Sequence, residues 1–290
     1  MRTPVTLHET LDGYFEVVPR PTPDELAAYY RAQYYGGTPQ YTRTYTPEEL
    51  AHKTLAADEA ARFAPPLGAL LEVGFGEGFF LAGFRARGWR VRGLDFTDEG
   101  LRAFHPELAP DVALGDVFAL LDGEIASGRH YELVACNNVL EHVLDPERLL
   151  RAMHALVAPG GVCRLQVPND GSWLHCELVA RGHADPAFWV HVPDHLNYFT
   201  PPSLQKLLAR CGWAIVDVLG DFPIELFLLN PDSNYERDRS KGRNCHFARV
   251  AVERLLRDRS IDELIAFRRG CAHAGLGRNL IAYVRPGAPA

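Results

Sequence analysis

The segment LLEVGFGEGFFLAGF (residues 70–84) places three glycines at alternate positions between an apolar run and a stretch of helical character. Because glycine has no Cβ, Gly74, Gly76 and Gly78 let the backbone of this turn come close to a ligand. The helix that follows offers its free N–H groups to an anion. Glu72 adds a carboxylate at the end of the apolar run. The segment therefore predicts a strand, a ligand-binding turn and a helix.

Downstream of this turn, short apolar runs alternate with helical stretches, which is typical of βαβ units in a mostly parallel sheet. Upstream, capping boxes that begin at Thr22 and Thr46 predict two helices, the second of which runs to the prolines at residues 65–66. The chain is therefore expected to form an α/β fold that is doubly wound around one sheet. Predicted strands occupy residues 69–74, 90–95, 111–116, 131–137, 162–168, 214–220 and 279–285.

The chain divides into three expected parts. Residues 1–66 form an N-terminal extension with helices, and residues 67–220 together with 279–290 form the core. Residues 221–278 join the last two predicted strands and contain two helical patterns, which indicates a helical insertion. Because long connections inside a compact domain are usually functional, we expect this insertion to be either a lid over an acceptor or a homodimer contact. Residues 169–200, rich in histidine and aromatic side chains, are expected to share in the lid.

Composition and charge narrow the classes of partner. The 290 residues carry a formal net charge of −7, so no positive field attracts nucleic acid, and no nucleic-acid partner is expected. No run approaches the ~18 uninterrupted apolar residues that a membrane span needs, and the N-terminus lacks the apolar core of a signal peptide. The six cysteines form no C-x-x-C pair, which argues against a zinc ribbon. We expect a cytoplasmic protein with no membrane span.

Two classes of nucleoside ligand use a glycine-rich turn of this kind. The dinucleotide fingerprint is G-x-G-x-x-G, but Phe79 stands where the third glycine of that pattern belongs. Asp95 ends the next predicted strand, where a carboxylate accepts hydrogen bonds from both hydroxyls of a ribose. Nicotinamide cofactors also make this ribose contact, so Asp95 does not distinguish the two ligand classes. The structural alternative is that Asp95 is the N-cap of the following helix. The glycine spacing is therefore the feature that argues against a nicotinamide-dependent oxidoreductase.

The pattern E-x-G-x-G-x-G at residues 72–78 resembles motif I of class I S-adenosylmethionine-dependent methyltransferases. The stretch YELVACNNVLEHVLDPERLLRAMHALVAPGGVCRLQVPND (residues 131–170) resembles the fourth-strand region of small-molecule methyltransferases of the ubiquinone-biosynthesis type and of bacterial families that modify sugars and natural products. The resemblance extends over residues 69–218. It implies a Rossmann-like sheet of seven mostly parallel strands with an antiparallel last strand. It also implies S-adenosylmethionine as the cofactor and methyl transfer to a small-molecule acceptor.

The same resemblance implies which residues hold the cofactor. Asp116 falls where methyltransferases of this class contact the adenine, although a helix N-cap is again the alternative. Four tyrosines are expected either to close over the cofactor or to pack one face of an amphipathic helix, namely Tyr30, Tyr34, Tyr35 and Tyr41. The expected cofactor-binding residues are Glu72, Gly74, Phe75, Gly76 and Gly78 around the methionine moiety, Asp95 and Phe96 at the ribose, Asp116 and Val117 at the adenine, and Asn137 and Asn138 at the fourth strand.

A methyl acceptor with a hydroxyl group must lose a proton as the in-line displacement proceeds. His195 is the predicted proton acceptor, because an imidazole near its unperturbed pKa of about 6.5 takes up a proton at neutral pH. Tyr198 beside it is predicted to position the acceptor, and His142 of the Leu-Glu-His-Val motif is the second catalytic candidate. The alternative for His195 is a hydrogen bond to a backbone carbonyl that holds its loop.

Four histidines of the long loop can in principle bind a metal ion, namely His175, His183, His191 and His195. No carboxylate or cysteine pattern accompanies them, so no metal cofactor is expected. The leading interpretation is methyl transfer to a hydroxyl of a sugar or natural product, and N-methylation of an amine is the nearest variant. Two other classes stay open, a nicotinamide-dependent oxidoreductase and a fold that binds a ligand without catalysis. The presence of every expected glycine and carboxylate argues against the last.

Overall fold

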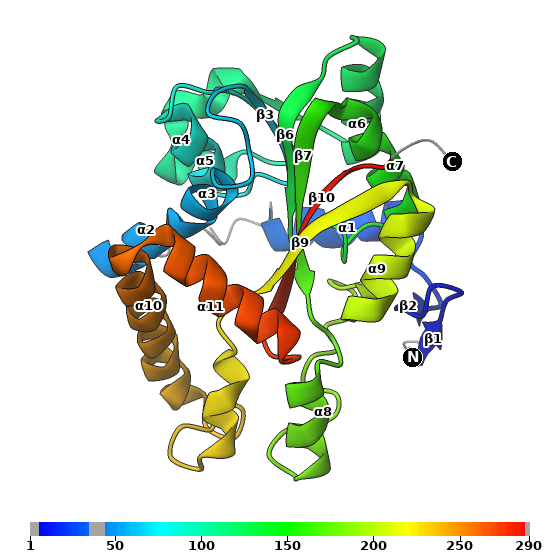
Figure 1. The fold of residues 1–290 in the computed structure, drawn as a ribbon. Coiled ribbons are helices and arrows are strands. Elements are labelled where there is room, and N and C mark those ends of the chain that lie inside the picture. Colours follow the sequence, from blue (N-terminus) through cyan, green and yellow to red (C-terminus); the bar gives the residue numbers. More distant parts are fainter. Residues whose placement is uncertain (1–5, 35–43, 288–290) are drawn as a thin grey trace.

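The computed structural model describes residues 6–34 and 44–287. Its centre is a seven-stranded sheet in the order β5-β4-β3-β6-β7-β10-β9 (Figure 1). Neighbours from β5 to β7 are parallel, and β10 is antiparallel to both of its neighbours, which confirms the predicted class, strand number and antiparallel last strand. The strands are β3 (Ala69–Val73), β4 (Arg90–Asp95), β5 (Val112–Leu114), β6 (Tyr131–Asn137), β7 (Val157–Pro168), β9 (Trp213–Gly220) and β10 (Asn279–Pro286).

Helices cover both faces of this sheet (Figure 1). On one face the core includes Leu121, Leu149 and Leu204, and on the other it includes Phe84 and Ile265. Because side chains alternate along each strand, one strand supplies both cores. The first face carries α6 (Val117–Ala126), α7 (Pro146–Leu156) and α9 (Pro201–Arg210), and the second carries α3 (Leu55–Ala60), α4 (Phe79–Arg85), α5 (Glu99–Phe104) and α11 (Ile261–His273), with a 3₁₀ helix η1 (Pro106–Asp111) after α5.

A second, antiparallel sheet joins the N-terminal extension to the long histidine-rich segment, and it was not predicted. The hairpin of β1 (Thr6–Glu9) and β2 (Phe15–Val18) pairs through β2 with β8 (Asn197–Tyr198). These strands have two to four residues each, which is too short for a period-two pattern to be recognised. Two further helices flank this sheet in the sequence, α1 (Pro23–Tyr34) and α8 (Trp173–Ala180).

The helix expected from Thr46 onward is divided in two. The capping box at Thr46 begins α2 (Pro47–Lys53), as predicted, but Thr54 is both the C-cap of α2 and the N-cap of α3. This break lets α3 pack in the core beside α4 while α2 lies against the insertion. The chain therefore brings residues from before the glycine turn into contact with the insertion.

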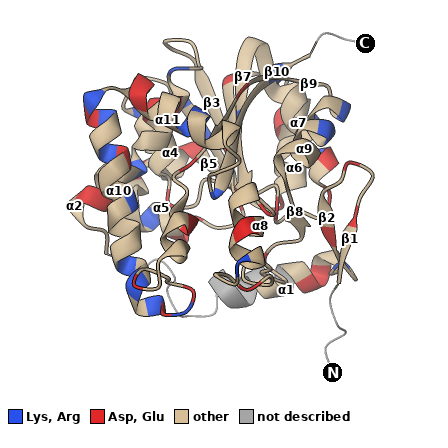
Figure 2. Cartoon of the chain, turned by 60° about the horizontal axis from the view of Figure 1, so that its bottom comes forward, with Lys and Arg blue, Asp and Glu red and all other residues tan. Residues whose placement is uncertain are grey.

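The insertion at residues 221–278 is helical, as expected. It contains the 3₁₀ helices η2 (Ile224–Leu229) and η3 (Arg239–Lys241), then α10 (Gly242–Arg259) and α11. Helix α11 packs on β9, and α10 lies between α11 and α2. Basic and acidic residues are interspersed over α2, α10 and their surroundings (Figure 2). Within the described ranges, no helix combines the length and the apolar character that crossing a bilayer demands.

Candidate cofactor and acceptor sites

The glycine turn between β3 and α4 has a backbone that favours glycine. Gly74, Gly76 and Gly78 have φ angles of 75°, 51° and 80°. A Cβ on Gly74 would come within 2.2 Å of Cγ2 of Val139, whereas a Cβ on Gly76 would meet no atom within 4 Å. Gly74 is therefore packed against protein, while Gly76 borders open space from which a ligand can contact the backbone.

Asp95, at the end of β4, holds this turn in place. Its Oδ2 accepts a hydrogen bond from the N–H of Gly76 at 3.0 Å, and its Oδ1 accepts one from the N–H of Phe96 at 2.7 Å. Burial raises the pKa of Asp95, and these N–H groups oppose the rise. The N-cap of α5 is Asp98, so the N-cap alternative does not describe Asp95. Its contact with a ribose stays a prediction.

Glu72, on β3, is buried next to the turn and keeps one oxygen without a partner. Its Oε1 accepts a hydrogen bond from Nδ2 of Asn137 at 3.0 Å. Its Oε2 is buried and has no hydrogen-bond partner among the described residues. Burial raises the pKa of Glu72 to about 8, although Asn137 and Arg164 oppose the rise. An isolated Glu72 therefore holds a proton at neutral pH, and a cation beside it would favour the carboxylate.

Asp116, expected at the adenine, is the N-cap of α6. Its side chain accepts a hydrogen bond from the N–H of Ala119 at 2.9 Å, so the alternative considered for it is observed, and Val117 follows as the first residue of the helix. The adenine contact of both residues stays a prediction. The tyrosines expected at the cofactor are not described, because the structure omits Tyr35 and Tyr41 and the side chains of Tyr30 and Tyr34.

The remaining predicted cofactor residues differ in exposure. Phe75 is buried in the core, whereas Phe96 is 39% exposed.

Asn138 adopts a positive φ of 56° at the end of β6. Its Oδ1 accepts a hydrogen bond from Nε2 of Gln166 at 2.7 Å, and its Nδ2 donates to Oε1 of Glu141 at 3.1 Å. The ends of β6 and β7 are thus linked by side chains at the edge where the glycine turn lies.

His142 and His195 come together with Glu141, which sequence reasoning did not anticipate. The two imidazole rings are 4.9 Å apart, and one ligand atom from each of the three side chains lies within 4.8 Å of the others. Of the four loop histidines considered as metal ligands, this group contains His195 alone. Nδ1 of His142 also lies 2.6 Å from the carbonyl oxygen of Asp194. Contact between residues on separate segments leaves no local signal in the sequence.

The pKa expected for His195 was wrong. Burial, with smaller effects of His142 and His191, lowers the pKa of His195 to about 3, so this imidazole is a weaker base than predicted. The hydroxyl of Tyr198 donates to the carbonyl of His195 and accepts from the N–H of His191, each at 3.2 Å. Tyr198 therefore braces the loop backbone. Catalytic roles for His142, His195 and Tyr198 stay predictions.

A cavity of about 320 Å³ lies beside the cofactor edge, between β7, β10, α2 and the insertion helices. Gln166 in its wall reaches Asn138 at the end of β6. Lys53 of α2, also in the wall, lies 2.5 Å from Glu77 of the glycine turn. Residues 169–200 were expected to share in this enclosure, but among the described residues they contribute none of the lining. Helix α8 packs instead on η2 of the insertion, and the end of the segment contacts the His142 loop.

Two histidine–glutamate pairs join α2 to α10 in the wall of this cavity. Nε2 of His52 lies 2.6 Å from Oε2 of Glu253, and Nε2 of His246 lies 3.0 Å from Oε1 of Glu49. Burial alone would raise the pKa of Glu253, but Arg268 and His52 outweigh it and lower the pKa to about 2. Glu253 is therefore ionised and orients the His52 imidazole. Sequence reasoning missed this pair because its members are 201 positions apart.

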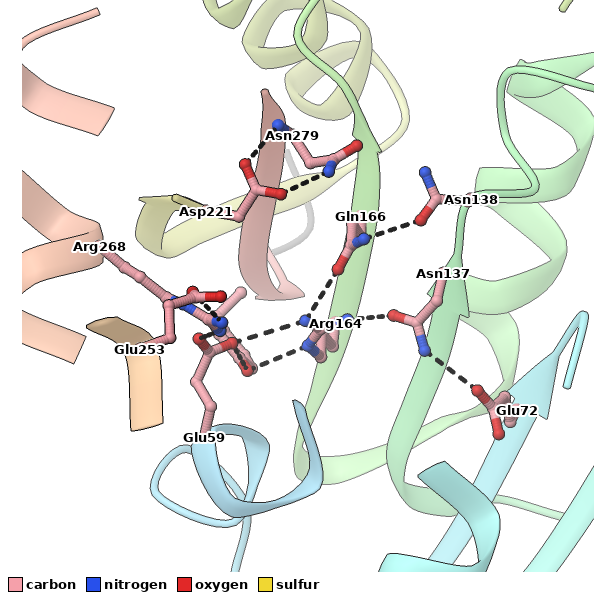
Figure 3. Close-up of polar contacts among 11 residues, drawn as sticks. Glu59, Glu72, Asn137, Asn138, Arg164, Gln166, Asp221, Glu253, Arg268 and Asn279 are labelled. Carbon is pink, nitrogen blue, oxygen red and sulfur yellow. Dashed lines mark hydrogen bonds and ion pairs between the residues drawn. The ribbon is translucent and has the colours of Figure 1, made fainter. Parts of the chain in front are cut away.

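A chain of buried polar side chains connects the cofactor edge to the cavity (Figure 3). Arg164, which is 1% exposed, donates to Oδ1 of Asn137 and lies 3.6 Å from Oε1 of Glu59. Arg268 donates to Glu59 at 2.5 Å and to Glu253 at 2.6 Å. The edge that carries the glycine turn and the cavity are thus parts of one connected structure. In order, the chain runs through Glu72, Asn137, Arg164, Glu59, Arg268 and Glu253.

Residues 43–218, more than half of the sequence, match the family model described as a methyltransferase domain. The chain belongs to this methyltransferase family. Ubiquinone biosynthesis O-methyltransferase of Psychrobacter arcticus is 30% identical over 160 residues, which cover 52% of this chain and 61% of that protein. The enzyme of the same name from Pseudomonas aeruginosa strain UCBPP-PA14 is 33% identical over 164 residues, with coverages of 52% and 66%. The methyltransferase chain spans less than two thirds of the length of these relatives.

Solved structures share the fold of this methyltransferase chain. The 1,6-didemethyltoxoflavin-N1-methyltransferase of Burkholderia thailandensis, solved with bound 1,6-didemethyltoxoflavin and S-adenosylhomocysteine, superposes with a TM-score of 0.54 at 18% identity and covers 97% of this chain and 99% of its own. A SAM-dependent methyltransferase of Archaeoglobus fulgidus gives a TM-score of 0.52 at 15% identity, with coverages of 89% and 98%. At these identities the likeness shows the class I methyltransferase fold alone.

Proposed function

We propose that this chain transfers a methyl group from S-adenosylmethionine to a hydroxyl group of a small molecule, which is a sugar or another natural product. The observation that carries the proposal is the cavity beside the glycine turn, where ionised Glu253 holds the imidazole of His52. A hydroxyl acceptor needs such a base, whereas an amine attacks in its neutral form. The O-methyltransferases among the relatives support this choice. The insertion then serves the acceptor rather than a homodimer contact.

The residues at the glycine turn fit this cofactor. The open space beside Gly76 admits a ligand against the backbone. The unpartnered Oε2 of Glu72 is an acceptor for the ammonium group of the methionine moiety, and that cation would lower the raised pKa of Glu72. Asp95 would hold the ribose, since each of its oxygens has a second lone pair beyond the backbone contacts. Asp116 would face the adenine.

His52 supplies the proton step of the proposed reaction. When bound, the cofactor would supply a methyl group on a positively charged sulfur for in-line attack by the acceptor oxygen, and the carbon–sulfur electron pair would stay with sulfur. His52 accepts the hydroxyl proton on Nδ1, because its Nε2 is hydrogen-bonded to Glu253. Glu253 stabilises the resulting imidazolium, as a carboxylate behind a catalytic histidine does.

S-adenosylhomocysteine is expected to raise the melting temperature, and NAD is expected to leave it unchanged. A ligand at about 100 times its Kd stabilises the native state by about 2.7 kcal/mol, which corresponds to a shift of roughly 5–10 °C. Differential scanning fluorimetry of the protein with each ligand measures this. Stabilisation by NAD together with no shift from S-adenosylhomocysteine would favour the oxidoreductase class and overturn the proposal.

The transferred methyl group is expected to appear as an O-methyl ether. Incubation with methyl-labelled S-adenosylmethionine and a fractionated pool of sugars and natural products should yield one labelled product, and its fragmentation spectrum locates the methyl group. Label on nitrogen would replace the hydroxyl by an amine acceptor. Binding of the cofactor without label in any fraction would favour the non-catalytic interpretation.

A further inference from the structure

We propose that the acceptor carries an anionic group, either a carboxylate or a phosphate, and that Arg249 of α10 binds this group in the cavity between α2 and α10. The inference rests on the proposed function, because that function assigns the cavity to the acceptor. A cavity of about 320 Å³ has the size of small-molecule sites in proteins. The charges of its wall decide whether it favours an anion.

The other lysine and arginine side chains of the cavity wall already have carboxylate partners. Lys53 lies 2.5 Å from Glu77. Arg268 lies 2.5 Å from Glu59 and also contacts Glu253, and Arg164 lies 3.6 Å from Glu59. Within these pairs the positive and negative charges balance, so they leave little net positive charge to attract a ligand.

Arg249 differs from them, because it forms no ion pair with any residue that the structure describes. One of its terminal nitrogens lies 3.3 Å from Nδ1 of His246, an imidazole rather than a carboxylate. Its Nε is buried and has no hydrogen-bond partner among the described residues. Residues 1–5, 35–43 and 288–290, which the structure does not describe, contain no aspartate or glutamate.

Asp221, an acidic residue of the same wall, is held by another partner. Its Oδ1 accepts a hydrogen bond from the N–H of Asn279 at 2.7 Å, and its Oδ2 accepts one from Nδ2 of Asn279 at 2.6 Å (Figure 3). Burial raises the pKa of Asp221, whereas the hydrogen bonds from Asn279 and, more weakly, the charge of Arg249 oppose the rise. A partly desolvated guanidinium without a carboxylate is unfavourable, and an anionic ligand relieves this through charge-assisted hydrogen bonds.

The position of Arg249 also suits the proposed reaction. Arg249 and His52 line the same cavity from α10 and α2, and Gln166 connects that cavity to the cofactor edge. An acceptor anchored by its anionic group at Arg249 can therefore present a hydroxyl to His52. Arginine suits this task because its planar fork binds a carboxylate or a phosphate through two parallel hydrogen bonds.

Three matched sugars test the proposal by isothermal titration in the presence of S-adenosylhomocysteine. Glucuronate carries a carboxylate, glucose 6-phosphate carries a phosphate, and glucose is neutral. One of the two anionic sugars is expected to bind about 10- to 100-fold more tightly than glucose. Arg249→Gln should abolish this preference, whereas Arg243→Gln, the same change at an exposed position of α10 outside the cavity, should retain it.

The outcomes separate the anion site from the proposed function. Equal affinities for the three sugars, binding of none of them, or an unchanged preference in Arg249→Gln overturns the anion site. Preference for one anionic sugar identifies the group as carboxylate or phosphate. Anion binding through Arg249 without any binding of S-adenosylhomocysteine would leave the site standing and overturn the proposed function. Methyl transfer to neutral acceptors at full rate in Arg249→Gln would overturn the anion site and leave the proposed function standing.

Discussion

Replacing His52 by glutamine is expected to lower kcat by about 10²–10⁴-fold, the range that a general base contributes, while S-adenosylhomocysteine binds as before. Glutamine keeps a donor for Glu253, which lies 2.6 Å from Nε2 of His52, so the contact between α2 and α10 survives. What the variant loses is a nitrogen that accepts a proton. Steady-state turnover with the identified acceptor, alongside titration of the cofactor product, measures both quantities.

Controls at other histidines decide whether His52 is the proton acceptor. His130→Ala removes an exposed histidine from the loop before β6 and should leave turnover unchanged. Added imidazole should restore part of the activity of His52→Ala, which a purely structural role would not permit. Should His52→Gln keep its turnover within a few-fold while His195→Ala loses it, the base is His195, and our assignment is wrong despite the pKa of about 3 at that imidazole.

Replacing Glu59 by alanine is expected to lower the free energy of unfolding by about 3–5 kcal/mol, because it leaves two buried guanidinium groups without this carboxylate. Glu59 is fully buried, and its oxygens meet Arg164, Arg268 and the hydroxyl of Tyr283. Urea unfolding followed by circular dichroism measures the change. The melting temperature should fall by roughly 10 °C.

An exposed ion pair provides the matched control for Glu59. Asp262 lies 2.9 Å from Arg62, with side-chain exposures of 64% and 52%, and its replacement by alanine should cost less than about 1 kcal/mol. Similar losses in the two variants would mean that the buried chain adds nothing beyond an ordinary surface contact. The stability of the connection between the cofactor edge and the cavity would then need an explanation other than these buried ion pairs.

The fold could be predicted because its signals are local. Each of the seven strands is a short apolar run bounded by polar or turn residues, and several helices begin at a recognisable cap, as Thr46 and Asp145 show. The glycine turn was recognisable for the same reason, since the positive φ angles of Gly74, Gly76 and Gly78 are a property of the turn itself. The two-residue strand β8 carries no such signal and was missed.

The placement of the predicted cofactor residues at one edge of the sheet was predictable, but not all of their contacts were. Glu72, Asp95 and Asn137 do meet at the carboxyl ends of neighbouring strands, as parallel strands require. The sequence did not reveal that Asp95 holds the N–H of Gly76, and it left open whether Asp116 caps α6 or contacts the adenine. Both contacts depend on how a side chain is oriented within the turn.

By itself, the sequence determined the α/β class, the glycine turn and the helical insertion, because these follow from spacing along the chain, and its resemblance to known motifs pointed to the methyltransferase family. Only the tertiary structure decided that His52 meets Glu253 and that Arg249 has no carboxylate partner among the described residues. In the sequence, α2 and α10 look like helices with solvated charged faces. Packing them together buries those charges, and burial sets which groups ionise, as it does for His195. The electrostatic role of a side chain depends on its neighbours in space, and the spacing of residues along the chain does not reveal those neighbours.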